Sequence, residues 1–179
     1  MSWVGMGESP PELERFLSGF ASPEDGAVLL FLGTVRSHNA GRAVRGLEYE
    51  AYLEMGEKVL AAIAGEAEDR FGTRRIGVYH RVGKLVVGEV STVIAVASPH
   101  REEAYGASRY IIEEIKKRLP VWKKESYVEG KSRWVEGHLP GKGDSGGPGG
   151  PGPGSERQGV EEMPPGMEPG DSKPGGSEE

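Results

Sequence analysis

The stretch SPHREEAYGASRYIIEEIKKRLPVWKKE, residues 98–125, contains the clearest helix signal in the chain. Ser98 and Pro99 are typical of an N-cap followed by a first-turn proline, and Glu102 and Glu103 lie where the helix dipole favours acids. Pro120 ends the predicted helix because proline cannot continue it. Its buried side is formed by apolar residues at helical spacing: Ala104, Ala107, Ile111, Ile112, Ile115 and Leu119.

Hydropathy patterns predict the other elements around this helix. Apolar runs and alternating patterns predict strands over 27–35, 47–52, 76–82 and 90–97, with 83–88 as a short connection or strand. Helical spacing predicts helices over 11–20 and 54–71, the second ended by Gly72. Residues 121–135 are predicted to form a hairpin that turns around 129–131. Strands and helices mix without a strict alternation, which predicts an α+β domain.

The last part of the chain differs in composition from the rest. Residues 141–179 hold 13 of the 29 glycines and 7 of the 13 prolines, with three basic residues against eight acidic ones. Such a segment buries too little apolar surface to offset the entropy of ordering its backbone. We therefore predict a folded domain over 1–140 and a disordered acidic tail over 141–179. The tail carries −5 of the net charge of −6, which leaves the domain near neutral.

The chain contains no cysteine, which excludes a disulfide framework and cysteine-based metal or nucleophilic sites. The N-terminus lacks the pattern of a signal peptide, and no stretch has the length of a transmembrane span. We expect a cytoplasmic protein. His80, in the predicted strand over 76–82, is interpreted as a core or surface histidine, because no His, Asp and Glu set has convincing metal spacing. No metal and no cofactor are expected.

Two sites could bind an anion. Arg36 follows the strand over 27–35 and precedes a polar loop over 37–42, although the residues alone favour a solvated arginine beside an ordinary turn. His100 and Arg101 lie where the backbone N–H groups of the predicted helix are unpaired and its dipole is positive.

Basic residues are also dense at the other end of this helix, between 116 and 133. Cations are favourable at a helix C-terminus in any case, so part of the cluster needs no functional explanation. Lys116 borders the apolar side of the helix, whereas Lys117 points further toward solvent, so Lys116 is the better candidate for a pocket. In a strand Lys123 and Lys124 face opposite sides, and the pattern does not decide between them.

Six segments in this order resemble the catalytic large subunit of molybdopterin synthase. They are GTVRSHN (33–39), YEAY (49–52), YHRVG (79–83), SPHREEAY (98–105), IKKRLPVWKKE (115–125) and RWVE (133–136). The resemblance covers about 26–138, nearly the whole predicted domain. It implies an α/β hammerhead-type fold with a mixed and antiparallel sheet.

The resemblance also implies an activity and partners. Family members transfer sulfur to cyclic pyranopterin monophosphate and so form molybdopterin. The sulfur comes from the thiocarboxylated C-terminal Gly-Gly of a small ubiquitin-like carrier subunit. The large subunit is a homodimer within a heterotetramer, without nucleic acid or membrane partners.

By position, the resemblance assigns roles to particular residues. The catalytic lysines correspond to Lys116 and Lys123, and Phe31 and Ile112 to apolar walls for the carrier tail or the pterin. The two lysines also belong to the substrate-contacting residues of the family. The others correspond to Thr34, Val35, Arg36, His100, Arg101, Lys124 and Glu125. Some relatives carry a lysine at the position of Thr34 and an arginine near that of His138.

Two alternatives remain at this stage. The basic segment over 116–133, with Trp122, Tyr127 and Trp134 nearby, could bind RNA, which predicts salt-sensitive binding without a carrier. Alternatively, the chain could be an inactive scaffold for the carrier, which the presence of both lysines argues against.

Overall fold

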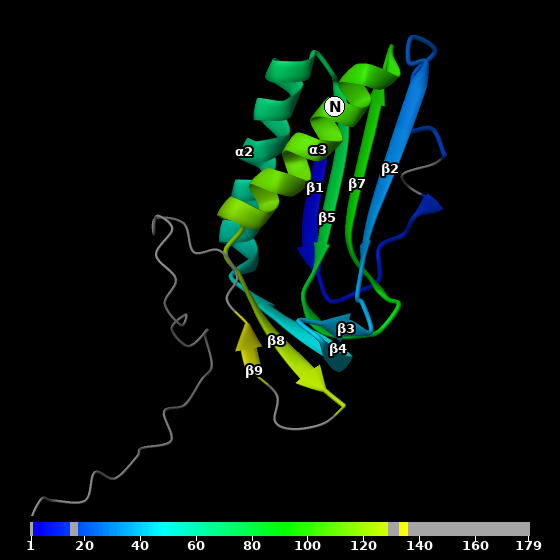
Figure 1. The fold of residues 1–179 in the computed structure, drawn as a ribbon. Coiled ribbons are helices and arrows are strands. Elements are labelled where there is room, and N and C mark those ends of the chain that lie inside the picture. The colour runs from blue at the N-terminus through cyan, green and yellow to red at the C-terminus, as the bar shows by residue number, and fades with distance from the viewer. Residues whose placement is uncertain (1, 15–17, 129–132, 136–179) are drawn as a thin grey trace, which may run out of the picture.

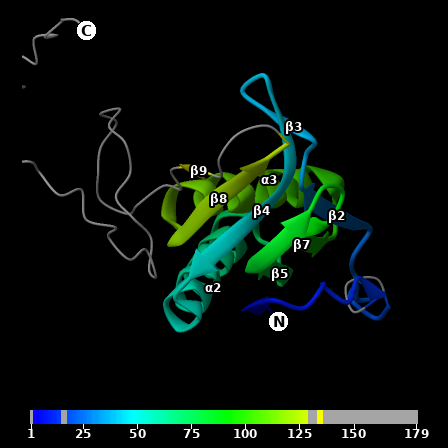
Figure 2. The same ribbon diagram turned by 90° about the horizontal axis from the view of Figure 1, so that it is seen from below.

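The computed structural model describes residues 2–14, 18–128 and 133–135. Two helices cover one face of a four-stranded sheet, and a second sheet lies at one end of this layer (Figure 1). Seen from below, β4 and β8 of the second sheet run side by side across the ends of the helices (Figure 2). The α+β class predicted from the sequence is confirmed.

The first sheet has the order β1-β5-β7-β2, with β1 parallel to β5 and the other pairs antiparallel. Its strands are β1 (Trp3–Gly7), β2 (Ala27–Thr34), β5 (Arg75–Arg81) and β7 (Val90–Ser98). The second sheet has the order β3-β4-β8-β9, with β6 also paired to β4. Its strands are β3 (His38–Asn39), β4 (Arg42–Ala51), β6 (Gly83–Val86), β8 (Val121–Tyr127) and β9 (Arg133–Val135).

The main core lies between the first sheet and the helices α2 (Leu53–Phe71) and α3 (Arg101–Arg118). Helix α2 buries Leu60, Ile63 and Ala67, which recur at three- and four-residue spacing and so share one face. Helix α3 buries Ala107, Ile111 and other small or aliphatic residues in the same way. Full burial of one Leu or Ile side chain stabilises the fold by about 1.5–3 kcal/mol, so this layer fixes α3 on the sheet.

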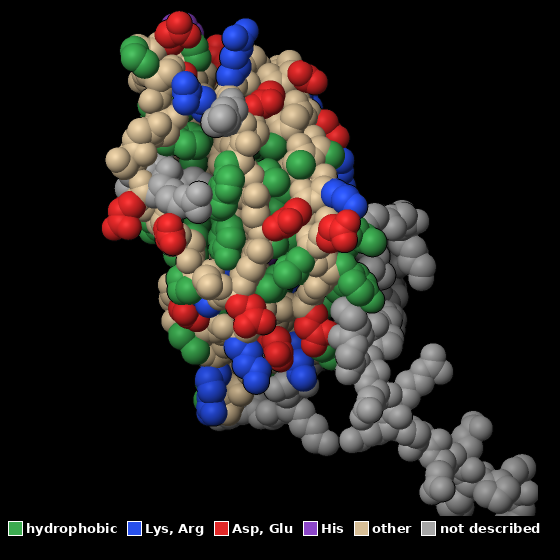
Figure 3. All heavy atoms as spheres, turned by 180° about the vertical axis from the view of Figure 1, so that it is seen from behind, with side chains coloured by type: hydrophobic (Ala, Val, Ile, Leu, Met, Phe, Trp, Pro, Cys, Tyr) green, Lys and Arg blue, Asp and Glu red, His purple; other side chains and the backbone are tan. Residues whose placement is uncertain are grey.

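The opposite face of the first sheet also carries apolar side chains (Figure 3). Val93 and Ala95 of β7 are fully buried there, beneath partly buried neighbours such as Leu30. Because side chains alternate along a strand, Phe31 packs against the main core while Leu30 faces the other side.

Several sequence predictions are confirmed in place. The helix predicted over 54–71 begins one residue earlier and ends at Gly72, whose φ of 68° is left-handed. The strands predicted over 27–35, 76–82 and 90–97 correspond to β2, β5 and β7, and the strand predicted over 47–52 corresponds to the second half of β4, which begins five residues earlier, at Arg42. The segment 83–88 contains strand β6, which pairs with β4 of the second sheet.

Other details differ from the predictions. Strand β1 was not predicted, because WVGMG is short and lacks an alternating pattern. Ser98 is the last residue of β7 and the N-cap of α3 is His100, because the chain must first leave the sheet. The loop predicted over 37–42 is a tight hairpin between β3 and β4.

Some predicted segments lie wholly or partly outside the described residues. The helix predicted over 11–20 includes 15–17, the hairpin turn falls on 129–131, and the tail covers 141–179. The domain boundary near 140 therefore stays a prediction. Within the described ranges, neither helix is apolar enough over a sufficient length to cross a bilayer.

Candidate functional site

A pocket of about 520 Å³ opens where the end of β2, the last turns of α3 and the second sheet meet. Most of the site residues predicted from the sequence line it: Phe31, Thr34, Val35, Arg36, Ile112, Lys116, Lys123 and Glu125. They come from elements far apart in the sequence, so the arrangement of the two sheets creates the pocket. The structure locates these side chains, while their roles stay predictions.

The end of β2 forms one rim of the pocket. The pairing of β2 with β7 shifts register between Gly33 and Thr34, a bulge-type irregularity that redirects the residues following it. Val35 is buried, and its N–H donates to the carbonyl oxygen of Glu89 at 3.0 Å. Arg36 comes directly after this anchored residue, so an exposed guanidinium is held at the pocket.

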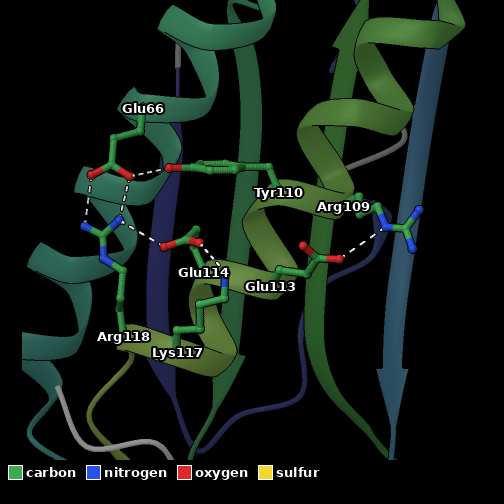
Figure 4. A network of polar contacts seen from close by, with 7 residues as sticks. All are labelled: Glu66, Arg109, Tyr110, Glu113, Glu114, Lys117 and Arg118. Carbon is green, nitrogen blue, oxygen red and sulfur yellow. Dashed lines mark hydrogen bonds and ion pairs between the residues drawn. The ribbon is translucent and has the colours of Figure 1, made fainter. Parts of the chain in front are cut away.

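Lys116 reaches the pocket from the last turn of α3. It has no ion-pair partner among the residues that the structure describes. Lys117 instead donates to Glu114 at 2.9 Å on the outer side of the helix (Figure 4). The phase of the helix therefore separates two adjacent lysines in the way that the apolar pattern predicts.

Lys123 and Lys124 face opposite sides of β8, as expected for neighbours in a strand. The Lys123 side chain lines the pocket, and its Nζ lies 2.8 Å from Oε1 of Glu125. The Nζ of Lys124 lies 5.4 Å from the centre of the Trp134 ring. Lys124 is not among the residues that line the pocket, in contrast to the substrate contact expected from the resemblance. The alternation of β8 explains this difference.

Glu125 is a buried carboxylate, only 3% exposed, among the residues that line the pocket. Asn39 donates to both of its oxygens at 3.0 and 2.9 Å, and the Tyr127 hydroxyl donates at 2.8 Å. Burial opposes ionisation, but the hydrogen bonds from Lys123, Asn39 and Tyr127 outweigh it and lower the pKa of Glu125. The carboxyl is therefore charged at neutral pH.

Polar residues that the sequence patterns did not indicate as site residues line the rest of the pocket, notably Asn39, Tyr49 and Ser91. Burial raises the pKa of the Tyr49 hydroxyl despite its hydrogen bond with Ser91. Tyr49 alternates with Glu48 and Glu50 in β4, a pattern that indicates a half-buried strand but not a pocket. Asn39 lies within the segment GTVRSHN, and only the hairpin that follows it brings it toward β8.

His80 is buried, and it also lines the pocket. Its Nδ1 lies 2.8 Å from the carbonyl oxygen of Arg81, and its ring contacts Tyr49 edge-on. Burial lowers its pKa to about 4, so the imidazole is neutral at physiological pH. The interpretation of His80 as a core histidine is compatible with this position.

His100 and Arg101 lie in a different cavity, together with Gly26, Ala27 and Pro99. Arg101 begins α3 and Lys116 lies near its end. At about 1.5 Å per residue, roughly 22 Å of helix separates them. Within one chain, the helix N-terminus therefore cannot bind the same phosphate as the lysines.

The pocket favours anions. Its charged lining residues are three cations, Arg36, Lys116 and Lys123, and one carboxylate, Glu125. Within the described ranges, no group of His, Asp and Glu is arranged to bind a metal ion. The pocket thus has a net charge of about +2 within low-dielectric walls, which strengthens attraction to a negatively charged ligand.

The comparisons with known proteins agree on one family. The family model described as MoaE protein matches residues 6–118. The molybdopterin synthase catalytic subunit of Halalkalibacterium halodurans is 42% identical over 132 residues, which cover 74% of this chain and 84% of the relative. That of Pyrococcus abyssi is 43% identical over 130 residues, which cover 72% and 87%.

A solved structure supports the same relationship. The crystal structure of molybdopterin synthase from Staphylococcus aureus matches with a TM-score of 0.70 and 38% identity, over 74% of this chain and 96% of that one. The sequence and the fold therefore agree: this chain belongs to the MoaE family, the catalytic subunits of molybdopterin synthase, which act in molybdenum cofactor biosynthesis.

Proposed function

We propose that this protein transfers sulfur to cyclic pyranopterin monophosphate, and that the sulfur comes from the C-terminal thiocarboxylate of a small ubiquitin-like carrier subunit. The observation that carries the proposal is the pocket in which Arg36, Lys116 and Lys123 converge around one buried carboxylate. Both the cyclic phosphate and the thiocarboxylate are anions, and a pocket with excess positive charge accommodates both.

The absence of cysteine supports an external source of sulfur. The whole chain has none, so no thiol of its own can carry or donate the atom. The sulfur must then arrive on another molecule. A flexible C-terminal Gly-Gly segment is narrow enough to reach into a pocket, and Phe31 and Ile112 supply apolar walls beside it.

The contacts of the two lysines suggest different tasks. Glu125 fixes the ammonium of Lys123 against the wall of the pocket, which suits a stationary cation for the phosphate or for a developing negative charge. Lys116 has no carboxylate partner among the described residues and extends from a helix end. It is the better candidate for proton transfer, or for a transient covalent link, during sulfur attack.

A homodimer would reconcile the two separate basic sites. His100 and Arg101 are too far from Lys116 to share a ligand within one chain, as the length of α3 shows. We propose that the His100–Arg101 segment of a second protomer completes the pocket of the first. The isologous contact of a two-fold dimer would then form two equivalent sites.

The RNA-binding alternative has less support from the contacts of its aromatic residues. Trp122 packs edge-on against Tyr52, and the Tyr127 hydroxyl donates to Glu125. Because these two side chains already contact other residues of the chain, they provide no stacking platform for bases.

The direct experiment combines the purified full chain, cyclic pyranopterin monophosphate and a carrier whose thiocarboxylate contains ³⁴S. The proposal predicts molybdopterin with both dithiolene sulfurs labelled, and no product with a carrier that ends in an ordinary carboxylate. Binding of the carrier without product would instead support the inactive scaffold. Salt-sensitive binding of RNA without any product would support the nucleic-acid alternative.

A further inference from the structure

We propose that Asn39 is a positioning residue of this pocket, which holds the Glu125 carboxylate in place and, through it, the ammonium of Lys123. The inference rests on the proposed function of Lys123. It assigns a role to a side chain that neither donates to nor accepts from Lys123 itself.

The geometry around Glu125 supports this role. The Nδ2 of Asn39 lies 3.0 Å from Oε1 and 2.9 Å from Oε2, so one amide group spans both oxygens of the carboxylate. Tyr127 donates to Oε2 at 2.8 Å, and the Nζ of Lys123 lies 2.8 Å from Oε1. The donors come from β3 on one side and β8 on the other, so the carboxylate cannot rotate without breaking a contact.

The β3–β4 hairpin is built to present this amide. Asn39 and Arg42 are paired across a turn whose two central residues, Ala40 and Gly41, have φ values of 46° and 75°. Positive φ at both central positions is typical of the tightest hairpin turns, and Ala40 is the only non-glycine residue with positive φ in the described part of the chain. The turn fixes the backbone of Asn39, and the two hydrogen bonds to Glu125 orient its side chain.

The other end of the turn secures the second donor. The guanidinium carbon of Arg42 lies 3.5 Å from the centre of the Tyr127 ring, a close cation–π contact. Asn39 thus contacts the carboxylate directly, and Arg42 contacts the tyrosine that donates to it. Both residues that flank the turn therefore act on the same short segment of β8.

The consequence for Lys123 follows from the cost of a buried charge. A carboxylate that is almost fully excluded from water requires satisfied oxygens. Without the Asn39 amide, Glu125 retains only the contacts from Lys123 and Tyr127. The carboxylate can then rotate or become protonated. Lys123 would then lose its fixed position, although its own side chain is unchanged.

Other titratable groups also surround Glu125. Lys123 and Tyr127 face it from β8 and Tyr49 from β4, and Arg36, His38, His80 and Lys116 line the same pocket. A titration must therefore be assigned by variants and not by its midpoint alone.

The chain has a single asparagine, which allows a direct spectroscopic test. Selective ¹⁵N-asparagine labelling of the full chain gives one side-chain amide signal, that of Asn39. At neutral pH we expect this signal to differ between wild type and Glu125→Gln, and to be unchanged by Lys84→Ala, an exposed substitution elsewhere in the same sheet. Identical Asn39 signals in wild type and Glu125→Gln would overturn the proposal.

A pair of substitutions separates positioning from a purely structural role in the turn. Aspartate is at least as well suited to a tight turn as asparagine, and alanine is less so. A structural role therefore predicts that Asn39→Asp retains more activity than Asn39→Ala. The positioning role predicts the reverse order, because the aspartate places a second negative charge against Glu125.

Molybdopterin formation with thiocarboxylated carrier is the activity to measure, with thermal unfolding to confirm that both variants fold. We expect a rate reduction of at least about tenfold for Asn39→Ala, the loss of roughly one hydrogen bond to a charged group, and a larger one for Asn39→Asp. We also expect the acid limb of the Asn39→Ala rate profile to move to higher pH, because removal of a donor raises the pKa of Glu125.

Equal rates for wild type and both variants would refute the role of Asn39. If wild type itself forms no molybdopterin, the proposed function fails, while the amide signal still tests the Asn39–Glu125 contact. The two failures are therefore distinguishable.

Discussion

Arg101 and Lys116 lie on the same helix but at opposite ends, in two separate cavities. The rise of an α-helix puts about 22 Å between them. Two sites that would share one phosphate are thus rigidly separated within a single chain, and only a second copy of the chain could bring them together.

This separation predicts complementation between inactive variants. Arg101→Ala and Lys116→Ala homodimers should each form molybdopterin slowly. In an equal mixture that exchanges subunits at random, half of the dimers would contain one of each variant, and one of the two pockets in each of these would combine an intact Arg101 with an intact Lys116. Activity should therefore return to roughly a quarter of wild type. Molybdopterin formation before and after subunit exchange measures this. If the mixture stays as inactive as the separate variants, the two residues do not act in one shared pocket.

The two helices are joined on their outer side by an ion-pair network (Figure 4). Arg118 donates to both oxygens of Glu66, at 2.5 and 2.9 Å, and the Tyr110 hydroxyl donates to the same carboxylate at 2.7 Å. Arg118 is also 3.5 Å from Glu114. This network holds the last turn of α3, which contains Lys116, against α2.

Loss of this network should destabilise the fold in a pH-dependent way. The hydrogen bonds from Arg118 and Tyr110 lower the pKa of Glu66 from its ordinary 4.5. The stabilisation is therefore present above pH 4.5 and is lost as the pH falls through the lower folded pKa. Because both side chains are partly exposed, Glu66→Gln should cost only about 0.5–1 kcal/mol at pH 7.

Chemical denaturation of wild type and Glu66→Gln at pH 7 and at pH 3 would measure the difference. The gap in the free energy of unfolding should narrow at the lower pH. An equal difference in the free energy of unfolding at pH 7 and pH 3 would show that the ionised carboxylate of Glu66 contributes nothing to stability.

Two glycines, Gly65 inside α2 and Gly72 directly after it, should have opposite effects on stability when replaced by alanine. Gly65 lies inside the helix with open space around its Cβ position, so Gly65→Ala should stabilise the protein by about 0.5–1 kcal/mol. Gly72 ends the helix with φ of 68°, where an added Cβ is strained, so Gly72→Ala should destabilise it by about 1 kcal/mol. The melting temperatures of the two variants, compared with wild type, test both predictions. Shifts of the same sign in Gly65→Ala and Gly72→Ala would contradict them.

The buried His80 predicts weaker stability in acid. Its pKa is about 4 in the folded protein, against 6.5 as its ordinary value. Between these values the unfolded chain binds a proton that the folded chain does not, so the free energy of unfolding falls as the pH drops from 6.5 toward 4. The full effect is about 3 kcal/mol.

His80→Gln removes the titrating group and keeps a polar side chain near the carbonyl oxygen of Arg81. Its stability should change less than that of wild type over this pH range. Parallel pH dependences for wild type and His80→Gln would mean that His80 does not cause the acid sensitivity.

Local patterns in the sequence predicted the elements with strong signals. Helix α3 and strands β2 and β7 have long apolar stretches or helical spacing, and Gly72 marks the end of α2 as expected. Helix phase separated Lys116 from Lys117, because that distinction depends only on the helix itself. The local pattern for β8 showed that Lys123 and Lys124 differ in direction, but not which one faces a pocket.

Features that depend on long-range pairing could not be predicted in this way. Strand β1 pairs in parallel with β5, more than 70 residues away in the sequence, and its own composition gives little sign of it. Asn39 meets Glu125 only because the β3–β4 hairpin packs next to β8. The distance between Arg101 and Lys116, in contrast, follows from the length of the predicted helix alone.

The role of Lys116 is tested by single-turnover rates of molybdopterin formation for Lys116→Ala and Lys117→Ala, with saturating thiocarboxylated carrier. The two lysines are adjacent, but one lines the pocket and the other pairs with Glu114 outside it. We predict that Lys116→Ala reduces the rate by about 10²–10⁴-fold, as expected for loss of a proton-transfer group, while Lys117→Ala stays near wild type. A Lys116→Ala rate close to wild type, or an equal loss of rate in both variants, would show that Lys116 is not the reactive lysine of the pocket.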